Sequence, residues 1–220
     1  MKIEIKGTII NDDDKWIYDF FDMTSTCPKD VADRMEEADG EDLDIYINSG
    51  GGAVFAGNEI YSAIRAYKGR VKIHVTGLAA SAASVIMCAA ESDISPTAMV
   101  MIHNVSSYAE GNYMDFQHES EVLRTASRAL CAAYVEKTGK SEEEMQKLMD
   151  KEKWFTAQEA VDMGLCDEIS GSEMQLVAAI APVIPDTVIK QMKGTIEKER
   201  SRWMAMGAAS ERLKNLEVEE

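Results

Sequence analysis

What most constrains the fold of this chain is an order that recurs along it: a short apolar segment, then glycines or small residues, then an amphipathic helix. Residues 43–47 alternate apolar and polar side chains, run into three glycines at 50–52, and are followed over residues 54–67 by apolar side chains at helical spacing. Residues 71–76 repeat the order, and a glycine and a small-residue run then lead into an apolar helix over residues 82–90. Strands that alternate with helices through short connections predict an α/β domain with right-handed crossovers and a mostly parallel sheet.

The rest of the chain up to about residue 169 fits the same pattern. β-Branched content, helical spacing and capping residues predict the remaining strands and helices. We expect strands at 3–10 and 99–102 and helices at 28–38, 113–137 and 154–164. Functional groups of parallel sheets lie at the carboxyl ends of strands. Three features occupy such ends: the turns expected at 50–52 and 77–81, and His103.

Composition limits the classes of protein to which the chain can belong. Its 39 acidic and 23 basic residues give a net charge of −16, which argues against nucleic acid as a partner because phosphates would be repelled. No segment approaches the roughly 18 apolar residues of a membrane span, and the start lacks the apolar region of a secretory signal. We therefore expect a cytoplasmic protein that does not bind membranes. Four cysteines without C-x-x-C spacing predict reduced thiols, and we expect neither a metal nor a cofactor.

The length allows one sizeable core and a surplus of chain. We expect a catalytic core over residues 1–169 and a C-terminal helical extension over residues 170–220, where prolines interrupt the pattern and the apolar stripe fades. The extension is either a helix that contacts a partner or scaffold, or a solvated, partly disordered helix.

Ser81 and His103 are the candidates for nucleophilic chemistry. Ser81 stands where a strand gives way to an apolar helix, so it is either a nucleophile beside unpaired backbone N–H groups or a plain helix N-cap. His103 follows another apolar strand, far enough after Ser81 for the chain to form one helix and return. A serine–histidine pair needs a third group to orient the imidazole, and the carboxylates of Asp150 and Glu152 are both available.

Four segments resemble, in order, the motifs of the Clp protease proteolytic subunit family, ClpP. They are residues 48–57, residues 77–81, residues 101–103, and residues 155–160 with 164–167. The acidic opening at residues 12–18 is similar, more narrowly, to the ClpP-like proteases of phages and prophages. The resemblance spans about residues 1–169 and implies a ClpP/crotonase-like fold of repeated ββα units.

The resemblance also implies roles for individual residues. Ser81 matches the nucleophile, His103 matches the general base, and the backbone N–H groups of Gly52 and Ala82 match the oxyanion hole. The family binds extended peptide along the edge of a glycine-rich loop, which here consists of Gly50, Gly51, Gly52 and Ala53.

Two positions depart from the family pattern. Gly50 stands where the family has Pro, which loosens the turn. The family's triad Asp falls at Glu152 when residues 155–157 are matched, and Asp150 is the alternative acid two residues earlier.

The resemblance implies a serine endopeptidase that acts alone or with an ATPase. The narrower resemblance to phage and prophage proteases implies a role in capsid maturation. Its substrate would be a polypeptide. The protein would form stacked heptameric rings, and the helix at 113–137 would supply the contact between the rings. Phage capsid or scaffold proteins are further candidate partners. The alternative is a catalytically silent, ring-forming phage head assembly protein. A third class, an acyl-CoA enzyme of the crotonase type, would leave Ser81 and His103 without a role.

Overall fold

The computed structural model describes residues 1–171 of the chain. Its strands are β1 (Lys2–Ile9), β2 (Ser25–Thr26), β3 (Leu43–Gly52), β4 (Val71–Ala80), β5 (Glu91–Ile94), β6 (Met99–Ile102), β7 (Lys153–Thr156) and β8 (Glu168–Ile169). Its helices are a short 3-10 helix (Asp12–Asp14), α1 (Lys15–Phe20), α2 (Pro28–Glu37), α3 (Val54–Ala66), α4 (Ala82–Met87), α5 (Tyr113–Thr138), α6 (Glu142–Met149) and α7 (Ala157–Met163).

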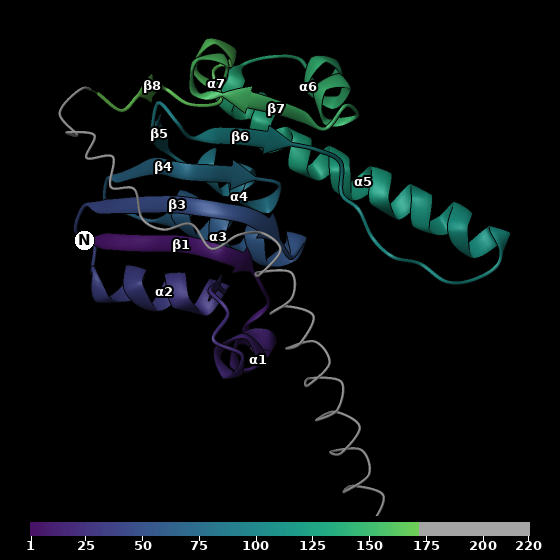
Figure 1. Ribbon diagram of the computed structural model, residues 1–220, viewed down its shortest axis with the longest axis horizontal. Helices are drawn as coiled ribbons and strands as arrows, with labels where there is room; N and C mark the ends of the chain where they lie inside the picture. Colours follow the sequence, from purple (N-terminus) through teal and green to yellow (C-terminus); the bar gives the residue numbers. More distant parts are fainter. Residues whose placement is uncertain (172–220) are drawn as a thin grey trace, which may run out of the picture. The chain divides into compact units, whose positions relative to one another are not determined.

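The strands form a mostly parallel sheet in the order β2-β1-β3-β4-β5-β8, as Figure 1 shows for its central strands. β4 has two neighbours on one side, because its first half pairs with β5 and its last three residues pair with β6. β7 is antiparallel to β6. The predicted α/β class and the mostly parallel sheet are confirmed.

The core follows directly from the period-two pattern of the strands. Along β3 the side chains of Leu43, Ile45 and Ile47 are buried, whereas the residues between them face outward. Every residue of α4 is buried, and this helix contacts α3, β3 and β4. Each isoleucine that is removed from water in this way stabilises the fold by about 1.5–3 kcal/mol.

The two segments expected as turns at 50–52 and 77–81 are strand for most of their length, so these boundaries were wrong. β3 continues through Gly52 because its glycines pair with Thr8 and Ile9 of β1. β4 continues through Ala80 because its last residues pair with β6. Glycines and alanines carry no strong local signal for a strand, and here the neighbouring strands supply the hydrogen bonds.

Other differences are local. The helix expected over 82–90 ends at Met87, and the one expected over 154–164 is divided into β7 and α7. α7 begins with a capping box: the Thr156 side chain accepts from the Glu159 N–H, and the Glu159 carboxylate accepts from the Thr156 N–H. Neither α1 nor β5 was predicted, because both are short and lack a clear period.

α5, the longest helix within residues 1–171, extends past the carboxyl ends of the strands (Figure 1). Its buried residues all lie in its second half and are Ser127, Leu130, Cys131, Ala133 and Tyr134. Asn112 caps its start and Gly139 ends it in the left-handed conformation, at φ 67°. Only the second half of α5 therefore belongs to the core.

The four cysteines are free and buried. Within residues 1–171 no helix combines the length and the apolar character needed to cross a membrane. By Cα proximity the chain divides into Met1–Glu173 and Met174–Glu220. The helical extension expected over residues 170–220 lies, from residue 172 onward, outside the described residues.

Candidate active site

Ser81 joins the end of β4 to the start of α4 in an uncommon backbone conformation, with φ 56° and ψ −127°. A residue other than glycine held at positive φ costs about 1–3 kcal/mol and persists only where its surroundings fix it. Here the Ser81 N–H donates to the Met101 carbonyl at 3.0 Å, and the Ser81 carbonyl accepts from the Ser84 N–H at 2.9 Å. Ser81 occupies the N-cap position of α4, but its hydroxyl forms no capping hydrogen bond.

The hydroxyl of Ser81 is instead hydrogen-bonded to His103, with 2.7 Å between Oγ and Nε2. His103 follows β6, and the pairing of Ala80 with Met101 places the two strand ends side by side. Among the described residues this is the one hydrogen bond of the His103 ring. A base nitrogen at this distance from a serine hydroxyl has the geometry for proton transfer.

The other two histidines have different surroundings. His74 lies on the outward face of the sheet, with Nδ1 at 2.8 Å from an Asp93 oxygen and Nε2 at 3.1 Å from an Asp44 oxygen. His118 is exposed on α5. Neither is hydrogen-bonded to Ser81.

The two candidate acids lie in different environments. Asp150 Oδ1 accepts hydrogen bonds from the side chains of Asn104 at 2.8 Å and Gln146 at 2.9 Å. These bonds hold the pKa of Asp150 below its ordinary value of 3.8. Neither Asp150 nor Glu152 is hydrogen-bonded to His103 within residues 1–171.

Glu152 is nevertheless close to His103 by strand register. The last antiparallel pair of β6 and β7 is Ile102 with Lys153, so His103 and Glu152 are the next residue on each side. Glu152 is exposed and has a positive φ of 49°, which marks a tight turn before β7. The register therefore favours Glu152 over Asp150 as the neighbour of the imidazole.

The glycine-rich segment lies against Ser81. A β-carbon at Gly51, whose φ is 90°, would be 2.7 Å from the Ser81 β-carbon and 3.0 Å from the Ala82 nitrogen. A β-carbon at Gly52 would be 2.0 Å from the Ile9 carbonyl oxygen, so Gly52 is pressed against β1. Both positions require glycine. A β-carbon at Gly50 would meet no atom within 4 Å, so packing does not require glycine there.

Three residues that support this arrangement escaped the sequence reasoning. Buried Ser49 donates to the Gly7 carbonyl at 2.6 Å and accepts from the Gly51 N–H at 3.1 Å, which fixes the glycine segment. The buried hydroxyls of Ser84 and Tyr134 are hydrogen-bonded to each other, and that of Ser84 also binds the Ser81 carbonyl. The one local signal was Ser84, a polar residue in the otherwise apolar helix α4.

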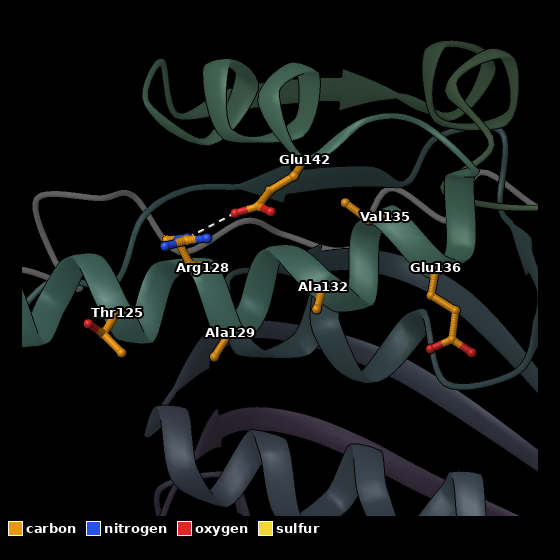
Figure 2. A pocket seen from close by; sticks show the side chains of 7 residues that line it. All are labelled: Thr125, Arg128, Ala129, Ala132, Val135, Glu136 and Glu142. Atoms are coloured by element: carbon orange, nitrogen blue, oxygen red, sulfur yellow. Dashed lines mark hydrogen bonds and ion pairs between the residues drawn. The ribbon is translucent and has the colours of Figure 1, made fainter.

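A groove of about 480 Å³ lies apart from Ser81, along α5 and the start of α6 (Figure 2). The side chains that line it are Thr125, Arg128, Ala129, Ala132, Val135, Glu136 and Glu142. Figure 2 shows Arg128 directed at Glu142, with which it forms an ion pair of 2.9 Å. The groove contains no pair of nucleophile and base, and no metal-binding group of histidines, cysteines and carboxylates occurs in the part of the chain that the structure describes.

Comparisons with known proteins identify the family of the chain. A family model described as Clp protease matches residues 32–173. The ATP-dependent Clp protease proteolytic subunit 1 of Chlamydia muridarum is 38% identical over 136 residues, which are 59% of this chain and 70% of that protein. The ATP-dependent Clp protease proteolytic subunit of Bacteroides fragilis is 34% identical over 133 residues, which are 59% of this chain and 64% of that protein.

Among solved structures, a mutant of ClpP1 from Listeria monocytogenes is similar with a TM-score of 0.65 at 27% sequence identity. The similarity covers 78% of this chain and 92% of that chain. The ClpP-like fold expected from the motifs is confirmed by this match.

Proposed function

The chain belongs to the Clp protease family, and from this premise we propose that it is a serine endopeptidase that hydrolyses peptide bonds through an acyl-enzyme on Ser81. The observation that carries the proposal is the 2.7 Å hydrogen bond between the Ser81 hydroxyl and His103 Nε2. A serine hydroxyl is a weak nucleophile until an adjacent base takes its proton.

In the proposed reaction each step is assigned to one group. His103 accepts the proton of Ser81 as Oγ attacks the peptide carbonyl, and it returns that proton to the leaving amine. Water then hydrolyses the acyl-enzyme with the same base. The backbone N–H groups of Gly52 and Ala82 stabilise the oxyanion, and Glu152 orients the imidazole. The close approach of Gly51 to Ser81 and Ala82 supports this assignment of the loop.

The substrate and the assembly belong to the same proposal. An extended polypeptide would lie along residues 50–53, at the end of β3, and add a strand there. The exposed apolar side chains in the first half of α5 support a ring of subunits that stacks on a second ring. We place this assembly in the cytoplasm, with or without an ATPase, and in phage or prophage capsid maturation; the last role is supported by the acidic segment at residues 12–18.

A catalytically silent, ring-forming phage head assembly protein is the second candidate. The observation that favours it is that neither Glu152 nor Asp150 is hydrogen-bonded to His103 within the described residues. A serine–histidine pair without an orienting acid retains only a small part of the activity of a triad.

A fluorophosphonate probe separates the two candidates. The folded protein is incubated with the probe, digested, and analysed by mass spectrometry. We expect the label on Ser81, and we expect Ser81→Ala to lose both the label and the cleavage of a peptide ester. An intact fold with Ser81 unlabelled, and equal ester cleavage by the wild type and Ser81→Ala, would favour the silent protein.

A further inference from the structure

Ser84 and Tyr134 form a polar pair in the most apolar part of the molecule. The side chains of both are fully buried, Ser84 in α4 and Tyr134 in the second half of α5, and their hydroxyl oxygens are 2.7 Å apart. The other residues of α4 are apolar or alanine. A buried hydroxyl is costly unless it is hydrogen-bonded, so an apolar pair would be the simpler way to fill this space.

The direction of the hydrogen bonds follows from the acceptor at their end. Ser84 Oγ is 2.7 Å from the Ser81 carbonyl oxygen, which can only accept, so the Ser84 hydroxyl donates to it. A hydroxyl has a single proton. The Tyr134 hydroxyl must therefore donate to Ser84, and the bonds run from Tyr134 through Ser84 to the Ser81 carbonyl.

The Ser81 carbonyl belongs to the same peptide unit as the Ala82 N–H. Because the peptide is planar and trans, its C=O and N–H point in opposite directions. A hydrogen bond that fixes the Ser81 carbonyl on one side therefore fixes the direction of the Ala82 N–H on the other side, and the Ala82 nitrogen lies close to Gly51, where an added β-carbon would be 3.0 Å from it. The Ser84 N–H and the Val85 N–H also bind this carbonyl, at 2.9 Å and 3.3 Å.

We propose that Ser84 and Tyr134 are positioning residues that aim the Ala82 N–H at the oxyanion by holding the Ser81 carbonyl. The inference rests on the proposed function, in which the Ala82 N–H is an oxyanion donor. This role explains why the hydroxyls of Ser84 and Tyr134 are buried next to Ser81, whose positive φ of 56° is strained.

The proposal predicts a defined kinetic change in two conservative variants. An oxyanion contact strengthens in the transition state, so misaiming it lowers kcat and leaves KM unchanged. For Tyr134→Phe, which keeps the ring and removes the first donor, we expect kcat to fall about threefold to tenfold. For Ser84→Ala, which removes the bond to the Ser81 carbonyl, we expect a fall of about tenfold to a hundredfold.

The double variant distinguishes a relay from two independent defects. Because Tyr134 acts through Ser84, the double variant should have the kcat of Ser84→Ala alone, within about twofold. Since His103 is untouched, the pH profile of kcat/KM should keep its shape in all three variants. The rate of fluorophosphonate labelling of Ser81 should fall in parallel with kcat.

Thr26→Val is the matched control. Thr26 is also a buried hydroxyl, with two 3.0 Å hydrogen bonds to the backbone of Lys6, and it lies on β2 at the edge of the sheet. The kcat of Thr26→Val should equal that of the wild type. Its thermal unfolding midpoint should fall by as much as that of Tyr134→Phe.

The inference is overturned if Tyr134→Phe and Ser84→Ala keep the kcat of the control, if their effect is on KM, or if the two effects multiply in the double variant. Should Ser84→Ala show no unfolding transition, Tyr134→Phe alone decides by the same kcat criterion. Failure of the proposed function is seen separately, because Ser81 would then stay unlabelled in the wild type as well. If Ser81 is labelled in the wild type but the variants keep the wild-type kcat, only this inference is overturned.

Discussion

The His103 ring has one nitrogen bound to Ser81, and its second nitrogen needs a carboxylate that holds the ring in place. Register places Glu152 beside His103, whereas Asp150 is occupied by Asn104 and Gln146. We therefore expect Glu152→Gln to lower kcat by about 10²- to 10⁴-fold, because an amide does not stabilise the imidazolium. Asp150→Asn should change kcat by less than about threefold, since its amide oxygen still accepts the same two hydrogen bonds. Hydrolysis of a peptide ester measures both effects.

Glu152→Asp is the matched variant for this residue. It keeps the charge and shortens the side chain by one methylene, so we expect it to retain most of the activity that Glu152→Gln loses. Circular dichroism should be the same for the three variants. If Asp150→Asn proves to be the inactive one, the assignment of the acid to Glu152 is wrong.

At the scale of single elements, α7 depends on its capping box. The Thr156 hydroxyl accepts from the Glu159 N–H at 3.3 Å, which satisfies one of the unpaired donors of the first turn. We expect Thr156→Ala to lower the free energy of unfolding by about 1 kcal/mol, and Thr156→Ser to lower it much less. Urea unfolding at pH 7 measures both. Equal losses for the two variants would show that the methyl group, and not the hydroxyl, stabilises this turn.

The same capping box predicts a pH dependence. Hydrogen bonds from the Thr156 backbone and hydroxyl hold the pKa of Glu159 below its ordinary value of 4.5. A carboxylate whose pKa is lowered by folding stabilises the protein. This stabilisation is fully present above the pKa of the unfolded state and is lost as the pH falls through the pKa of the folded state. The difference in unfolding free energy between the wild type and Glu159→Ala should therefore be largest above pH 4.5 and shrink below it. A difference that grows on acidification would contradict this sign.

At the scale of the whole molecule, charge and apolar surface oppose each other. The net charge of −16 makes two copies repel, while large apolar side chains are exposed on α5 and the loop before it: Tyr108, Tyr113, Met114, Phe116 and Val122. Burial of such side chains between subunits stabilises an assembly by about 1.5–3 kcal/mol each. We expect a species larger than the 24.3 kDa monomer, and we expect salt to strengthen it because ions screen the repulsion.

Sedimentation of two variants checks this assembly. Phe116→Ser should weaken it at least about tenfold, which corresponds to about 1.4 kcal/mol. Phe20→Ser removes a more exposed ring, from α1, and should leave the assembly unchanged. A wild type that sediments as a monomer at all salt concentrations, or a larger effect of Phe20→Ser, would exclude α5 as the contact.

Much of the fold is encoded locally and could be predicted from the sequence. The spacing of Ile60 and Ile64 predicted α3, Pro28 marked the start of α2, and β6 was predicted with the bounds that the structure has. Periodicity and capping act between residues a few positions apart, so they can be recognised without knowing the fold. Ser81 and His103 were found in the same way, each by its place at the end of an apolar strand.

What the tertiary structure alone decided involves residues far apart in the chain. The glycine segment ending at Gly52 is strand only because β1 pairs with it. The Ser81 hydroxyl binds His103 and does not cap α4, because β4 and β6 end side by side. Ser84 and Tyr134 are 50 residues apart, and no local pattern joins them. Local patterns in the sequence identified most of the strands and helices and the residues that can do chemistry. Which hydroxyl meets which partner depends on long-range packing, because a hydrogen bond requires its atoms to lie within about 3 Å.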